Sequence, residues 1–231
     1  MMDRKIIELD TRYFWATSFD WQIDWRGNAG QTGVTGAGQV VFSNQPRWIG
    51  RPDFATFRRD RIRSWRGVIA QARGRYNAFR VKMRDPLRPS WAEMGSAYTG
   101  GLITHSDGTT FSDGSGYTQG ITSPILASAA AGATSLQING DYLGNFISSG
   151  HIFSINDWPY QATGIEGQGE NAVLYFETPL RRAVTPDDEI NLDATCLCAL
   201  EGDLEGASRV EPADIARTKL SLVEWVGPGR E

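Results

Sequence analysis

Residues 151–177 read HIFSINDWPYQATGIEGQGENAVLYFE, and this stretch decides the fold class of the chain. Its apolar runs are short and are separated by Asn156-Asp157 and by the segment from Gly164 to Gly169, which are typical turn residues. Runs of this length with turn signals between them predict β-strands. Similar short runs follow one another at 136–138, 190–192 and 195–200. We therefore expect a small β-barrel or sandwich domain over residues 123–205.

The N-terminal region predicts a second set of strands. Between Tyr13 and Trp25 aromatic and polar residues alternate, and the alternation resumes at 36–42 after the glycine-rich segment 27–33. This pattern favours a long half-buried strand, or a pair of strands, followed by a hairpin with a glycine-rich connection.

Two further strand-like segments, 75–83 and 218–224, complete this first set, and we expect the second of them to return to the N-terminal sheet. The predicted fold class is mainly β. It comprises an N-terminal β-sandwich domain with one α-helix, plus the small β-barrel or sandwich domain inserted within it. The sandwich takes residues 1–86 and 206–231, and segment 87–122, rich in Gly, Ser and Thr, is expected as an excursion.

Residues 52–73 form the clearest helix candidate. Pro52 suits the first turn, Gly74 suits the C-terminal cap, and apolar residues recur between them at three- and four-residue spacing. Arginines occupy much of the remaining surface of this helix. The candidate interface residues are Arg58, Arg59, Arg61, Arg63 and Arg66.

The charge of the 231-residue chain is distributed unevenly. Residues 1–92 hold 17 Lys and Arg against 8 Asp and Glu, whereas residues 93–231 hold 6 against 19. Such asymmetry is typical of a nucleic-acid partner, or of a subunit whose basic face contacts the acidic face of a neighbouring copy. The net charge of −4 and the aromatic residues between the arginines argue against a nucleic-acid site.

Residues typical of catalysis or metal binding are few. Cys196 and Cys198 lie two positions apart, where a disulfide would be strained and no other zinc ligands are near, so we expect two buried thiols on a strand. The two histidines lack metal-binding spacing. The acidic clusters at 187–189 and 201–205 could supply the carboxylate pair of a glycosidase, but adjacent acids in turns are usually solvated. We expect no enzyme activity, no metal site and no cofactor.

The sequence also bears on targeting. No apolar segment approaches the roughly 20 residues that a membrane helix needs, so we expect no membrane span. The first eight residues carry charges where a secretory signal has its apolar stretch. We therefore expect synthesis in the cytoplasm.

The order of these elements resembles the distal tail and minor tail (tail-tip) proteins of long-tailed bacteriophages and gene transfer agents. The resemblance rests on the aromatic N-terminal strand pair, on the segment from Pro52 to Phe79 followed by Asp85-Pro86, and on three stretches of the second domain. Those stretches are Gly132–Gly140, Gly150–Ile155 and Pro179–Val184. Together these segments span most of the chain.

This resemblance implies a structural protein of the virion, located at the tail tip. Such proteins form a homo-oligomeric ring, usually a hexamer, that joins the tail tube protein to the hub or baseplate proteins and to the host-attachment apparatus. DNA passes through the ring without sequence-specific binding. A ring of this kind requires two different complementary faces on each copy. We expect the candidate arginines to pair with carboxylates of the neighbouring copy.

A carbohydrate- or cell-wall-binding β-sandwich module is the alternative function. Eight tryptophans permit it, because aromatic rings stack on sugars. Trp15, Trp21 and Trp25 share the parity of Phe19 and Ile23, however, which favours a core or interface stripe. A tryptophan on a concave, solvent-exposed surface would favour the carbohydrate module.

Overall fold

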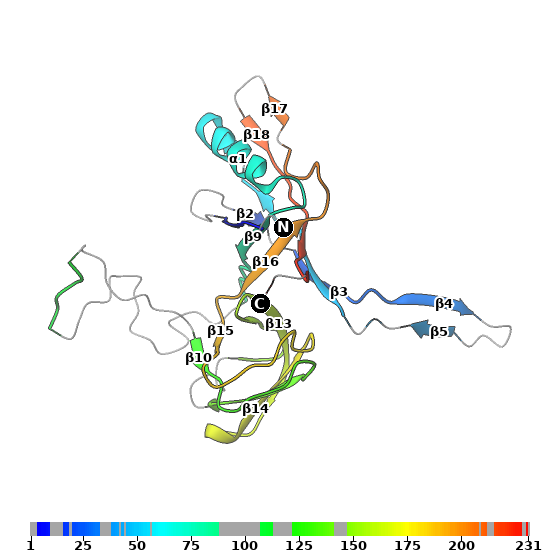
Figure 1. Cartoon of the computed structure of the whole chain (residues 1–231), viewed down its shortest axis with the longest axis vertical. Helices are drawn as coiled ribbons and strands as arrows, with labels where there is room; N and C mark the ends of the chain where they lie inside the picture. Colours follow the sequence, from blue (N-terminus) through cyan, green and yellow to red (C-terminus); the bar gives the residue numbers. More distant parts are fainter. Residues whose placement is uncertain are drawn as a thin grey trace. The chain divides into compact units, whose positions relative to one another are not determined.

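The computed structural model describes residues 4–9, 16–18, 20–32, 38–41, 43, 45–55, 57–87, 107–112, 122–140, 147–207, 209–211, 215–227 and 230. The chain divides into two compact units, and Figure 1 labels many of their strands. Unit 1 comprises residues 1–84, 157–159 and 194–231, and unit 2 comprises residues 85–156 and 160–193. Strands predominate, and α1 (Arg59–Ala72) is the one α-helix among the described elements. The prediction of a mainly β chain with one helix is confirmed.

Unit 1 is built on a six-stranded sheet whose strands are, in spatial order, β1 (Ile6–Glu8), β9 (Ala78–Lys82), β16 (Thr195–Leu200), β19 (Leu222–Glu224), β6 (Arg47–Gly50) and β3 (Trp21–Asp24). β1 pairs in parallel with β9, and the other neighbours are antiparallel. Because β19 lies between β16 and β6, the C-terminal segment joins the sheet of the N-terminal strands. β3 lies at one edge of this sheet.

Three smaller sheets belong to the same unit. β8 (Phe57–Arg58) pairs with β18 (Ile215–Arg217), which also pairs with β17 (Arg209–Glu211). β2 (Ala16–Ser18) pairs with β7 (Asp53–Phe54). β4 (Asn28–Thr32) and β5 (Gly38–Val41) form an antiparallel two-stranded ribbon, seen in Figure 1, that no other described strand extends. Segment 27–33, predicted as a connection, therefore contains a strand.

Helix α1 begins later than the predicted range of 52–73, because the residues before it are extended. The backbone N–H of Phe54 donates to the carbonyl of Thr218, and β8 pairs with β18, so neighbouring strands supply the hydrogen bonds that a helix would otherwise provide. The helix ends at Ala72 because Arg73 and Gly74 are both left-handed, with φ of 51° and 62°.

Unit 2 is built on a second six-stranded sheet with the order β10 (Thr122–Pro124), β15 (Glu189–Asn191), β12 (Ile152–Ile155), β13 (Trp158–Glu166), β14 (Ala172–Glu177) and β11 (Ser135–Ile138). The short 3-10 helix η1 (Gly169–Asn171) joins β13 to β14. Phe153, Tyr160 and Phe176 pack their rings together in its core, with centroids 5.3–5.6 Å apart. Within the described residues this sheet stays open, so the barrel form of the predicted domain is not observed.

The boundaries of the insertion differ from the predicted ones. Apart from residues 157–159, which belong to unit 1, the insertion runs from residue 85 to residue 193, whereas the predicted one runs from 87 to 205. The return is earlier because β16, which we assigned to the inserted domain, pairs with β9 and β19 of unit 1. A short strand does not reveal from its own sequence which sheet it joins. The predicted excursion 87–122 lies mostly outside the described residues.

Candidate subunit interface

The predicted interface arginines lie on or beside helix α1. Arg58 is the N-cap residue, and the other four lie within the helix. At roughly 100° per residue, Arg59, Arg63 and Arg66 share one face because they are spaced i, i+4 and i+7. Arg61 lies roughly 160° around the helix axis from Arg63. The structure thus brings three of the five predicted residues together, and we call Arg59, Arg63 and Arg66 the arginine row.

All five arginines are exposed, and within the described residues their side chains make no ion pair or hydrogen bond. Other arginines of the chain are paired. The Arg47 guanidinium lies 3.2 Å from the Asp24 carboxylate, and the Arg182 guanidinium lies 2.9 Å from that of Asp188. The arginines of α1 therefore differ in kind from those that stabilise the two units internally.

Arg80 illustrates how a paired arginine behaves in this protein. Its guanidinium contacts Glu8 and lies 3.0 Å from the carboxylate of Asp157. Burial alone would lower the pKa of Arg80, but these two carboxylates outweigh burial and raise it. Its charge is therefore compensated within unit 1, whereas the charges of the arginine row have no compensating group among the described residues.

The inner face of α1 holds the arginine row in place. Trp65 is fully buried and Ile62 is 4% exposed. The Trp65 ring packs against Phe54 and Phe57, with centroids 4.9 and 5.5 Å away, and its indole N–H donates to the Gly206 carbonyl at 2.7 Å. Because this face fixes the helix to unit 1, the opposite face is free to carry charge without contributing to the core.

The charge asymmetry of the sequence follows the division into units. Unit 1 holds 20 Lys and Arg against 15 Asp and Glu, and unit 2 holds 3 against 12. Several acids of unit 2 are exposed to solvent, namely Glu166, Glu170, Asp187 and Glu189. One copy of the chain therefore carries both a basic and an acidic surface.

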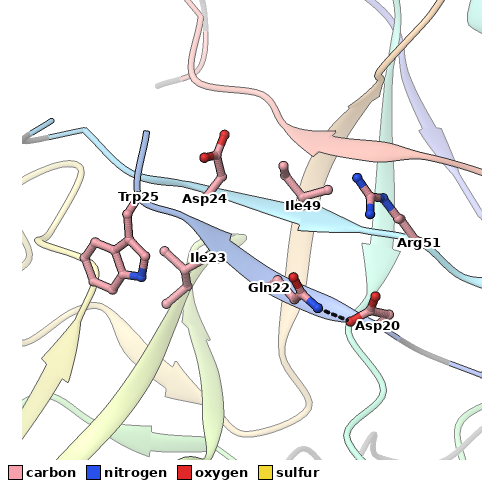
Figure 2. Close-up of a pocket in the computed structure, with 7 residues that line it drawn as sticks. All are labelled: Asp20, Gln22, Ile23, Asp24, Trp25, Ile49 and Arg51. Atoms are coloured by element: carbon pink, nitrogen blue, oxygen red, sulfur yellow. Dashed lines mark hydrogen bonds between the residues drawn. The ribbon is translucent and has the colours of Figure 1, made fainter. Parts of the chain in front are cut away.

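An open hollow of about 270 Å³ is a second surface feature of unit 1. It lies along edge strand β3 and the adjoining part of β6, and Figure 2 shows the side chains that line it. Asp20, Gln22 and Arg51 supply polar groups, and the Trp25 ring is 39% exposed beside them. No sequence pattern groups Arg51 with the others, because it is the pairing of β3 with β6 that brings them together.

The exposure of Trp25 contradicts the core half of the predicted core or interface stripe, and the interface half stays a prediction. Trp21 is half-buried and packs over Gly50, where a Cβ atom would lie 2.4 Å from the indole ring. Trp25 is exposed because it follows an edge strand, beyond which no described strand of the sheet lies. Trp15 and Phe19, the other aromatic members of the stripe, lie outside the described residues.

The two cysteines are buried thiols on β16, as predicted. Both are 0% exposed, both are free, and their Sγ atoms lie 3.2 Å apart. Burial, together with the neighbouring thiol, raises the pKa of Cys196 well above its usual value, which keeps it protonated and a poor nucleophile. In the part of the chain that the structure describes, no group of three or more His, Cys, Asp or Glu is placed to hold a metal ion.

Comparison with known proteins does not assign a family. Neither a scan against protein-family models nor a search of curated proteins finds a match to this chain. Among the described elements, no helix has both the length and the apolar character that crossing a membrane requires.

Proposed function

We propose that the chain is a structural subunit of a bacteriophage tail tip, a distal tail protein. Its copies form a ring, of six in our proposal, that joins the tail tube to the hub and host-attachment apparatus of the virion. The observation that carries the proposal is the arginine row, three exposed guanidinium groups on a helix that Trp65 anchors. Guanidinium groups held this way, with no ion pair among the described residues, are suited to a protein partner.

A second copy of the chain offers the matching charge. Unit 2 carries four times as many acidic as basic residues, so a neighbouring copy presents carboxylates to the arginine row. A contact between two different faces is heterologous, and it closes into a ring when the rotation between copies allows. Arginines that contact protein in this way leave the DNA passing through the ring without phosphate contacts that would retain it.

The β4·β5 ribbon also favours assembly. An isolated two-stranded ribbon is marginally stable in water, and its outer edges carry backbone groups that can pair with another chain. Among the described strands, neither β4 nor β5 pairs with anything except the other. A ribbon of this kind gains stability when a neighbouring subunit covers it.

The mass of the protein in solution tests the proposal. Light scattering coupled to size exclusion, with negative-stain imaging of the same fractions, should show rings of about six times the 25.5 kDa chain mass. The measurement is made at low and at physiological ionic strength, because salt weakens contacts between exposed charges. A species that remains monomeric across these conditions and at high protein concentration would contradict the proposal.

The second candidate function is a carbohydrate- or cell-wall-binding module, and one observation favours it. Trp25 is exposed beside an open hollow that also contains polar side chains. A monomer that binds glycan would support this candidate over the tail-tip ring. Neither function calls for catalysis, a metal or a cofactor.

A further inference from the structure

The free edge of β3 is a feature that the proposed subunit contacts leave unexplained. β3 is the last described strand of the unit 1 sheet on that side, and the hollow of about 270 Å³ lies along it. None of the residues that line this hollow belongs to α1, which carries the arginine row. The edge is therefore a separate surface of unit 1.

The pairing of β3 with β6 determines which peptide groups face the free edge. The Arg51 N–H donates to the Asp20 carbonyl at 3.0 Å, and the pairing continues from there along β3 without a shift. In an antiparallel pair, residues that exchange hydrogen bonds with the partner strand alternate with residues that do not. The even-numbered residues of β3 therefore direct their peptide groups toward β6. The odd-numbered ones, Trp21 and Ile23, direct theirs toward the free edge.

These outward peptide groups are open to another strand. No described residue forms a backbone hydrogen bond with Trp21 or Ile23 on that side. Proteins commonly protect such an edge with Lys, Pro or a β-bulge. β3 contains neither Lys nor Pro, and its register with β6 is regular, whereas the register of β4 with β5 is shifted.

The hollow extends around this edge. Neighbouring residues of a strand point to opposite faces of the sheet, and Figure 2 shows the Ile23 and Asp24 side chains on opposite sides of β3. Both residues line the hollow. The space beside β3 is therefore accessible from both faces of the sheet, which is the place where the backbone of an added strand would lie.

The side chains along the edge differ between the two faces. One face carries Asp20 and Asp24; Asp24 pairs with Arg47 at 3.2 Å, whereas Asp20 is exposed and makes no ion pair with a described residue. The other face carries Trp21 and Ile23, which are half-buried. A strand that joins β3 places its side chains about 4.5–5.5 Å from these residues. Basic residues suit the first face of such a strand, and apolar residues suit the second.

We propose that β3 receives an extended segment of another protein as a further strand of the unit 1 sheet, and that this segment alternates apolar and basic residues. Its backbone bonds the peptide groups of Trp21 and Ile23, and its basic side chains lie opposite Asp20 and Asp24. β3 spans about 13 Å at roughly 3.3 Å per residue, so about five residues of the segment make contact. All these residues of β3 belong to one copy, so binding does not require the ring.

A second copy of the chain suits this edge less well. Antiparallel pairing of two copies through β3 by a twofold axis sets the acidic face of one copy beside either the acidic or the apolar face of the other. Like charges directly opposite each other destabilise a sheet, and a carboxylate beside an apolar residue gains no ion pair. A different protein with basic residues at alternate positions has neither disadvantage.

Amide hydrogen exchange of the full-length protein, resolved to single residues by mass spectrometry, tests the proposal. In the free protein the amides of Trp21 and Ile23 should exchange rapidly, and those of Gln22 and Asp24 slowly, because only the second pair bonds β6. The probe is a synthetic peptide of about eight residues in which valine alternates with lysine. At millimolar concentration it should slow exchange at Trp21 and Ile23 by about tenfold or more, and leave Gln22 and Asp24 unchanged.

Matched peptides separate the backbone contribution from the charge. A peptide with glutamate in place of lysine should bind severalfold more weakly, because its carboxylates lie opposite Asp20 and Asp24. The lysine peptide with methylated backbone nitrogens should not bind, because it cannot donate hydrogen bonds to β3.

Matched variants test the same two contributions on the protein. Ile23→Pro removes the outward N–H but keeps the bonds to β6, so it should weaken binding of the lysine peptide by about tenfold or more. Ile23→Val keeps that N–H and a β-branched side chain, and should bind as the wild type does. Asp20→Lys, at an exposed position, should reverse the preference between the lysine and glutamate peptides.

Protection by the lysine peptide that is lost in Ile23→Pro and kept in Ile23→Val supports the proposal, whether the protein is a ring or a monomer. The proposal is overturned if neither peptide protects Trp21 and Ile23, or if the methylated peptide binds equally well. Amides that are protected in the ring and exposed in the monomer would assign the edge to a second copy, and would also overturn it. If Ile23→Pro does not fold, the reversed preference of Asp20→Lys decides.

Discussion

The two faces of helix α1 belong to one short segment of sequence, yet they are held by different interactions. The inner face buries Trp65 and Ile62 against the rest of unit 1. The outer face presents the arginine row to solvent, and its charges are not compensated within the described residues. Burial of the inner face maintains the fold, whereas the outer face contributes little to folding and is available for a partner. Folding and assembly should therefore respond to different substitutions.

Removing the Trp65 side chain should produce the largest loss of stability. Trp65→Ala leaves a cavity beside Phe54 and Phe57 and removes the hydrogen bond to Gly206, so the free energy of unfolding should fall by about 3–5 kcal/mol. Denaturant unfolding followed by circular dichroism measures this. Trp25→Ala is the matched control. Because Trp25 is exposed, removing its side chain should lower the free energy of unfolding by about 1 kcal/mol or less. Equal losses for the two variants would show that the inner face of α1 does not anchor it.

Removing the Arg230 side chain should give the next largest loss of stability. Arg230 is paired within the protein, in contrast to the arginine row. Its guanidinium lies 3.2 Å from the Trp158 ring centroid and donates to the carbonyls of Asp157, Leu197 and Trp225. Arg230→Ala should lower the free energy of unfolding by about 2–3 kcal/mol, because it removes both the stacking and these hydrogen bonds.

The matched control for Arg230 is Arg66→Ala, an exposed arginine of the row. It should change the free energy of unfolding by about 0.5 kcal/mol or less. A similar loss for Arg66→Ala and Arg230→Ala in the same denaturant series would contradict the distinction between paired and unpaired arginines.

Acidification should cause a smaller loss of stability, which depends on the ion pair between Asp188 and Arg182 in unit 2. Burial raises the pKa of Asp188, but hydrogen bonds from Thr185 and Asn156 and the charge of Arg182 outweigh burial and lower it. A lowered pKa means that the folded carboxylate resists protonation. Its contribution to stability is present above the unfolded pKa, near 3.8, and is lost as the pH falls through the folded pKa.

Chemical unfolding between about pH 6 and about pH 2 measures this effect. The free energy of unfolding should decrease below about pH 4, and Asp188→Asn should show a shallower decrease. Asp187→Asn, at the exposed neighbouring position, should keep the pH dependence of the wild type. An unchanged slope in Asp188→Asn would mean that the Arg182 pair does not contribute to acid stability.

Reversing charges in the arginine row should have the smallest effect on folding and a decisive effect on assembly. Arg59 and Arg63 are like charges at i and i+4, and two glutamates at the same positions repel each other to the same extent. Arg59→Glu combined with Arg63→Glu should therefore leave the free energy of unfolding unchanged, or slightly higher because position 59 lies in the first turn of α1, where the helix dipole favours an anion. The same variant should be monomeric by light scattering, because its glutamates face the carboxylates of the neighbouring copy.

The control for this variant reverses two exposed arginines outside α1. Arg26→Glu with Arg51→Glu makes the same change in net charge and should leave the ring intact. Rings that persist in the double variant of the arginine row would exclude this row as a subunit contact. Rings lost in both variants would indicate a general effect of net charge.

Much of the fold could be predicted from local patterns, and the exceptions have a common cause. The strands around Phe153, Tyr160 and Phe176 follow the short apolar runs of the sequence. The start of α1 differs from the predicted one because Phe57 and Arg58 pair with β18, more than 150 residues away in the chain, and Asp53 and Phe54 pair with β2. β16 was assigned to the wrong domain for the same reason, since its partners β9 and β19 decide where it belongs.

Some features of the candidate site likewise follow from the sequence, and others only from the tertiary structure. The sequence alone determined which residues are arginines, their helical spacing and the opposite charge of the two units, because composition and a 3.6-residue period are local properties. Only the tertiary structure decided that Trp65 is buried, and that Trp25 and Arg51 line one hollow. The pairing of β3 with β6 and the burial of one helix face depend on contacts between distant segments, which local sequence does not encode.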